Sequence, residues 1–166
     1  MKRPALWTSI AIISAAVLAL QIVLLRALSI TGYYHFAYLI IGTALLGFGA
    51  SGTALSLLWG RIKNHIELWG ARALGLFVIS SAASYPLAMA VRPDMQYLLY
   101  EFGQVGRMAL EIFLLFLPFF FAGFFVGLVL SSFPRQAGRL YAANLFGSGI
   151  GALLGVGILF LVPAVD

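Results

Sequence analysis

The ionisable side chains that fall inside long apolar runs are the residues best placed to do chemistry in this chain. Arg26 and Glu111 each lie about one turn inside the expected outer end of such a run. Ionisable groups at that depth in a membrane are costly, and they are functional candidates by default. Structural roles are also open to them, because Arg26 can extend its side chain to the head groups. Arg107 precedes Glu111 by four residues, a spacing that allows an ion pair on a helix.

A second pair of polar residues, Tyr141 and Asn144, lies near the start of the last apolar run, at its expected cytoplasmic end. Both side chains can form hydrogen bonds to a neighbouring helix, which is a recognised contribution to packing in lipid. The candidate polar site of the sequence therefore consists of Arg26, Glu111, Tyr141 and Asn144.

Other kinds of catalytic or metal chemistry find little support in the sequence. Cysteine is absent, which excludes disulfides, thiolate metal sites and a cysteine nucleophile. His35 and His65 are the only histidines, and the expected topology places them on opposite sides of the membrane, so they cannot share a haem or a metal ion. No nucleophile with a base and no inward carboxylate pair stands out. We expect no catalytic residues, no metal and no cofactor, and hence no enzyme.

The glycines at positions 147, 149 and 151, with Asp166 downstream, imitate a dinucleotide-binding sequence. That sequence works only at the turn between a strand and a helix of a βαβ unit. Here the glycines lie within one apolar segment, so they favour helix packing over nucleotide binding.

The elements that must position these residues follow from composition. Of the 166 residues, 63% are hydrophobic and only 9% are charged, against about 25% charged in soluble domains. The long apolar runs predict an all-α, polytopic integral membrane protein that forms a single transmembrane domain, since about 20 apolar residues suffice to cross a bilayer as a helix. The expected spans are five: residues 5–30, 36–59, 73–91, 108–131 and 140–163.

The distribution of basic residues predicts the orientation of these spans. With the N-terminus in the cytoplasm, seven basic residues fall on the inside: Lys2, Arg3, Arg61, Lys63, Arg72, Arg135 and Arg139. Only Arg26, Arg92 and Arg107 fall at outer ends, together with acidic residues. This bias follows the positive-inside rule and predicts an N-in, C-out protein of the cell inner membrane. The net charge of +5 therefore reads as a topology signal, and we expect no nucleic-acid partner.

Small residues recur at helical spacing in three of the expected spans. Such residues let a second helix approach to backbone contact, which is how packing is achieved in lipid. The predicted helix-packing residues are Gly47, Gly49, Gly52, Gly123, Gly127, Gly147, Gly151 and Gly155.

Four stretches of the chain resemble the membrane region of the fused-membrane spermidine synthase-like proteins: Gln21–Ser29, Tyr34–Tyr38, Ala44–Thr53 and Gly138–Gly147. The family often has an acidic residue where this chain has Asn144. The resemblance implies a related membrane fold, usually joined to a soluble aminopropyltransferase-type domain. It implies no activity for this chain, because no catalytic residue can be carried over. We expect either a fragment of a longer protein or a free-standing membrane module.

Three functions remain open from the sequence. The preferred one is a non-catalytic transmembrane scaffold or accessory subunit of a larger assembly, with membrane lipids, other membrane subunits or copies of itself as partners. The second is the membrane domain of a spermidine synthase-like enzyme whose soluble domain is missing from this chain. The third is a small transporter or a transporter fragment, although complete transporters of the type with two six-helix halves have many more spans.

Overall fold

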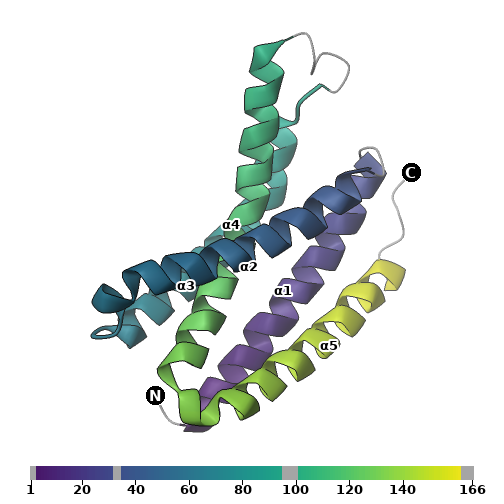
Figure 1. The fold of residues 1–166 in the computed structure, drawn as a ribbon. Coiled ribbons are helices and arrows are strands. Elements are labelled where there is room, and N and C mark those ends of the chain that lie inside the picture. Colours follow the sequence, from purple (N-terminus) through teal and green to yellow (C-terminus); the bar gives the residue numbers. More distant parts are fainter. Residues whose placement is uncertain (1–2, 32–34, 95–100, 162–166) are drawn as a thin grey trace.

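The protein is described by a computed structural model that covers the backbone of residues 3–31, 35–94 and 101–161 (Figure 1). The described residues contain five α-helices and one short 3₁₀ helix, and no strand. In chain order these are α1 (Arg3–Thr31), α2 (His35–Ile62), α3 (Ile66–Val91), α4 (Phe102–Ser132), η2 (Pro134–Gln136) and α5 (Ala137–Leu161).

All five α-helices are long and apolar enough to cross a membrane. An isolated backbone polar group cannot be left unpaired in lipid, so apolar runs of this length fold as helices whose hydrogen bonds close within the segment. The prediction of an all-α, multi-pass membrane protein with five spans is therefore confirmed.

Two helices begin six or seven residues earlier than the apolar runs predicted. The third starts at Ile66 instead of residue 73, and the fourth at Phe102 instead of residue 108. Glu67 and Arg72, which fall between the second and third expected spans, are therefore helical. Arg72 lies with its guanidinium 5.6 Å from the ring centroid of Trp69, a cation–π contact that accommodates the charge beside an apolar surface.

The helices associate in three main pairs. Helix α5 runs parallel beside α1, α3 runs antiparallel beside α4, and α2 crosses α4 (Figure 1). Helix α4 is the most buried span, and its fully buried side chains include Leu115, Phe119 and Leu128. It is the element on which α2 and α3 pack, whereas α1 and α5 pack mainly on each other.

The N-terminal half of α4 and the C-terminal half of α3 extend beyond the crossing with α2, and form the upper part of Figure 1. At 31 residues, α4 is about 46 Å long at 1.5 Å per residue, against a hydrocarbon core of about 30 Å. One or both ends of α4 therefore reach the interfacial region.

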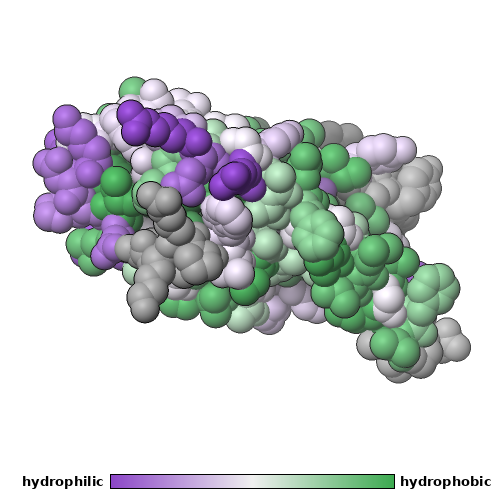
Figure 2. All heavy atoms as spheres, turned by 90° about the horizontal axis from the view of Figure 1, so that it is seen from below, coloured by the Kyte–Doolittle hydropathy of each residue, from purple (hydrophilic) through white to green (hydrophobic). Residues whose placement is uncertain are grey.

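Figure 2 shows the molecule from below. Hydrophilic residues gather on the left of this face, under the α2–α3 turn of Figure 1, while hydrophobic residues dominate its right side. The turn carries Arg61 and Lys63, both exposed. This end of the helices is the one to which the sequence assigns a cytoplasmic position.

Candidate functional site

The tightest contact in the described structure is the seam between α1 and α5. A Cβ atom built on Gly147 would lie 2.7 Å from the Cα of Ala11, and one on Gly151 would lie 2.5 Å from the Cα of Ala15. Both would also collide with a carbonyl oxygen of α1. One turn further on, a Cβ on Gly155 would lie 3.2 Å from the Cα of Ala19. These three glycines let two backbones touch, because any side chain would occupy the space of the neighbouring helix.

Polar groups bridge the same seam near the start of α5. The Ser14 hydroxyl oxygen lies 2.6 Å from Oδ1 of Asn144 and 2.7 Å from the carbonyl oxygen of Ile10. A hydroxyl donates one hydrogen, so both contacts form together when Ser14 donates to Ile10 and Asn144 turns its amide to donate to Ser14. Nearby, the guanidinium of Arg139 on α5 lies 5.7 Å from the ring centroid of Trp7 on α1.

A second glycine contact holds α2 across α4. A Cβ on Gly47 would lie 2.7 Å from the Cβ of Phe119, and one on Gly123 would lie 2.5 Å from the Ser51 hydroxyl oxygen. Gly127 has more room, with the nearest atom of Leu55 at 3.2 Å. The two helices therefore approach each other through small residues on both sides, Gly47 with Ser51 on α2 and Gly123 on α4.

Gly49 and Gly52 were also predicted to pack against a helix, but they meet no other part of the described chain. A Cβ on either would find no atom within 4 Å, and both residues are exposed. They belong to a side of α2 that we call the open α2 face, formed by Gly49, Gly52, Thr53, Ser56 and Gly60, all exposed. Helix α2 has two glycine-containing faces, and the internal packing uses only the one with Gly47.

The seam between α3 and α4 repeats every seven residues. Gly70, Phe77 and Ser84 are buried on α3, and Glu111, Pro118 and Phe125 are buried on α4. Gly70 lies against Phe125, with a built Cβ 3.7 Å from its ring. Because the two helices are antiparallel, 14 residues after Gly70 on α3 corresponds to 14 residues before Phe125 on α4. Ser84 is therefore level with Glu111. The half of this seam toward the C-terminal end of α3 carries the polar residues Ser80, Ser84, Gln104 and Glu111, which we call the polar half-seam.

Glu111 is the most unusual member of the polar half-seam. Its side chain is 0% exposed, and neither carboxylate oxygen has a hydrogen-bond partner within the described chain. The ion pair with Arg107 that the sequence allowed is thus not formed, and Arg107 is exposed. The positive charge that acts electrostatically on Glu111 belongs to Arg92, at the C-terminal end of α3.

The four residues of the predicted polar site are not gathered in one place. Arg26 is exposed on α1, as expected for a side chain that reaches toward the head groups. Tyr141 is 55% exposed on α5, while Asn144, one turn later, is half-buried against α1. Glu111 lies on another helix pair. The structure therefore has two separate polar places, Ser14–Asn144 in the α1–α5 seam and Glu111 in the polar half-seam.

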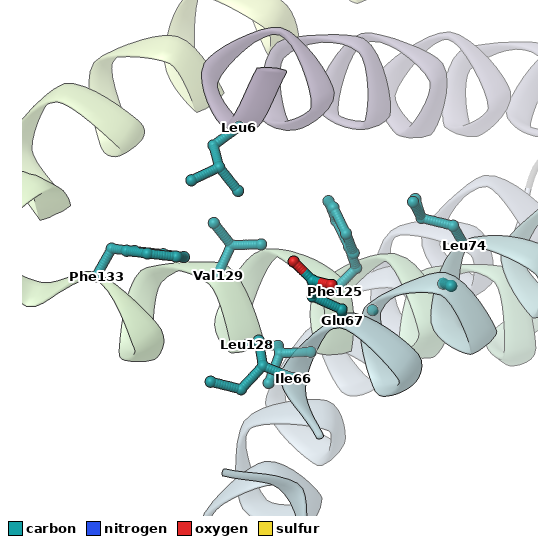
Figure 3. A pocket seen from close by; sticks show the side chains of 10 residues that line it. Leu6, Ile66, Glu67, Leu74, Phe125, Leu128, Val129 and Phe133 are labelled. Atoms are coloured by element: carbon teal, nitrogen blue, oxygen red, sulfur yellow. The ribbon is translucent and has the colours of Figure 1, made fainter. Parts of the chain in front are cut away.

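An apolar cavity of about 440 Å³ opens between α1, α3 and α4. Figure 3 shows Leu6, Phe125, Val129 and Phe133 around it, with the Glu67 carboxylate among them. Its lining suits an acyl chain or an apolar side chain, because it offers a single charged group and no set of converging polar atoms.

Sequence reasoning missed Ser14, Ser84 and Gln104. The signal that could have found Gln104 is its spacing, since residues 104, 111, 118 and 125 recur at seven-residue intervals on one face of α4. The described residues contain no cluster of three acidic or histidine side chains able to hold a metal ion.

Comparison with protein-family models, curated proteins and solved structures finds no match to this chain. The resemblance to the membrane region of spermidine synthase-like proteins therefore stays a prediction from the four stretches that carry it.

Proposed function

We propose that this chain is a non-catalytic transmembrane scaffold or accessory subunit of a larger assembly in the cell inner membrane. The observation that carries the proposal is the open α2 face. Tight internal contacts are made by Gly47 of α2, Gly123 of α4, and Gly147, Gly151 and Gly155 of α5. Gly49 and Gly52 meet nothing in the described chain.

Lipid alone gives no reason for small residues on that face. Lipid tails pack well against branched and aromatic side chains, but close approach of another helix requires residues that leave the backbone accessible. The Thr53 hydroxyl donates a hydrogen bond to the carbonyl oxygen of Gly49 on its own helix, at 3.2 Å. This polar group therefore needs no hydrogen-bond partner from another helix. A helix of another subunit, or of a second copy, fits the open α2 face.

The inner membrane is proposed from charge. Basic residues are concentrated at one end of the spans, near the α2–α3 turn and the α4–α5 turn. In membranes where the positive-inside rule operates, this end faces the cytoplasm.

The direct test is Gly52→Leu, compared with Gly75→Leu on α3. Both glycines are exposed and meet no atom within 4 Å, so neither substitution should disturb the fold. We expect Gly52→Leu to release the chain from its complex at unchanged abundance and thermal stability, and Gly75→Leu to leave the complex intact. Co-purification that survives Gly52→Leu would argue against docking on this face.

A second candidate function is small-molecule transport, which the buried Glu111 favours because intramembrane carboxylates mark substrate and ion pathways. If this is the function, Glu111→Ala abolishes substrate movement in vesicles without lowering protein abundance. The scaffold function predicts instead that the complex forms normally in this variant.

A further inference from the structure

Glu111 stands apart from every other acidic residue whose burial is described. Glu67, Asp94 and Glu101 are exposed, whereas Glu111 is fully buried. Helix packing does not require a carboxyl group at this position, since a glutamine or an apolar residue would fill the same space. The scaffold function leaves this residue without a role.

Among the described residues, nothing around Glu111 stabilises a negative charge on it except the more distant charge of Arg92. The neighbouring positions in the seam, Ala88 and Leu115, are fully buried and apolar. Ser84, level with Glu111 on the facing helix, has its hydroxyl 3.1 Å from the carbonyl oxygen of Ser81. A hydroxyl has one hydrogen to donate, so Ser84 has none left for Glu111.

Gln104, two turns before Glu111 on the same face, is likewise engaged. Its Oε1 accepts from the backbone N–H of Asp94 at 3.1 Å, and its Nε2 lies 3.3 Å from Oε2 of Glu101. These contacts tie α4 to the end of α3 and leave the Glu111 carboxyl outside the network.

A metal ion is a poor occupant for this place. Calcium and magnesium ions need about six or more oxygen ligands, and the buried polar side chains of the polar half-seam, Ser80, Ser84, Gln104 and Glu111, supply fewer side-chain oxygens than that. The charge of Arg92 also opposes a second cation. A proton requires only one oxygen and removes the cost of burying an unpaired charge.

The charged groups around this site lie at its outer edge. Just after α3 they are Arg92 and Asp94, just before α4 it is Glu101, and on α4 it is Arg107. Asp94, Glu101 and Arg107 are exposed, and Arg92 is the one whose charge acts on Glu111. Figure 1 shows this part of α4 beside α3 and beyond the crossing with α2, so α3 is the helix packed against it.

We propose that Glu111 is a reversible proton-binding site within the membrane-spanning part of the protein. In the closed hairpin of α3 and α4 the carboxyl is neutral, with the proton on one of its two oxygens. When the polar half-seam opens toward the outer surface, the O–H bond breaks, the proton passes to water, and the carboxylate that remains gains the attraction of Arg92.

The first test is infrared spectroscopy of the full chain in lipid vesicles, with Glu111→Gln as the reference. The difference spectrum should contain the carbonyl stretch of a neutral carboxylic acid at neutral pH, and this band should disappear as the pH is raised. If the difference spectrum shows carboxylate bands at neutral pH and no acid band, the proposal is overturned.

Labelling with dicyclohexylcarbodiimide gives a second readout that does not depend on a variant. This apolar reagent adds to protonated carboxyl groups, and the modified peptide is found by mass spectrometry. We expect labelling at Glu111 and not at the exposed Glu67 or Glu101, falling about tenfold per pH unit above the titration point of the group. Equal labelling of all three, or none at Glu111, would contradict the proposal.

Melting temperatures of variants distinguish a protonated Glu111 from a Glu111 that forms a permanent ion pair with Arg92. A neutral carboxyl is mimicked by glutamine, so Glu111→Gln should melt at the wild-type temperature at neutral pH. If Glu111 and Arg92 form an ion pair instead, Glu111→Gln and Arg92→Gln should lower the melting temperature by similar amounts.

Discussion

Gly151 sets the distance between α1 and α5, because a built Cβ would lie 2.5 Å from the Cα of Ala15. We expect Gly151→Leu to force these helices apart and to lower the free energy of unfolding by more than the roughly 1–3 kcal/mol typical of overpacking. Reversible unfolding in detergent measures this loss. Gly149→Leu is the matched control, since Gly149 lies on the same helix, is exposed and meets no atom within 4 Å. Equal stability of the two variants would contradict the backbone contact.

The Ser14–Asn144 contact should matter much less. Hydrogen bonds between membrane helices contribute about 0.6 kcal/mol on average, because the unfolded chain also finds partners in the membrane. We therefore expect Ser14→Ala to cost roughly that amount, and a double-mutant cycle with Asn144→Ala measures the coupling directly. A coupling energy near zero would show that the two side chains do not interact in the membrane.

Individual residues were predictable from the sequence to different degrees. The spacing of Gly147, Gly151 and Gly155 placed them on one face, and the structure puts all three against α1. The same reasoning on Gly49 and Gly52 gave no internal partner, since small residues indicate that some helix can approach but not which one. The position of Glu111 inside an apolar run indicated that burying its charge costs free energy. Its separation from Arg107 depends on how α3 covers the side chain, which helix periodicity cannot predict.

At the scale of the elements, the α2–α4 crossing depends on Gly123 of α4. A built Cβ there would lie 2.5 Å from the Ser51 hydroxyl oxygen and 3.1 Å from the Cα of Phe48. We expect Gly123→Leu to separate the two helices and to reduce the folded fraction in membranes, as measured by protease resistance. Gly49→Leu, on the open α2 face, should leave protease resistance unchanged.

The existence of the five helices followed from hydropathy, but their ends and pairing did not. The third helix extends seven residues further toward its N-terminus than its apolar run, because charged residues such as Glu67 and Arg72 can be helical where the chain leaves the hydrocarbon. The pairing of α1 with α5 joins the first and last spans. Hydropathy marks each of them as a span in the same way and therefore cannot choose this pairing over others.

For the whole molecule, the distribution of basic residues predicts that the α2–α3 turn is cytoplasmic and the start of α4 is on the outer side. The absence of cysteine makes this testable with single introduced thiols. We expect Asn64→Cys to resist a membrane-impermeant thiol reagent added to intact cells, and Glu101→Cys to react with it. Both positions are exposed in the structure. The reverse pattern would invert the proposed orientation.

The central claim is that this chain packs within the membrane against a partner that its own helices do not supply. Native mass spectrometry of the protein, extracted in mild detergent from its own membrane, tests it most directly. The scaffold account predicts that the 17.9 kDa chain appears within a larger complex, and that Gly52→Leu, but not Gly75→Leu, releases it at its own mass. A wild-type chain that runs alone at 17.9 kDa would contradict the account.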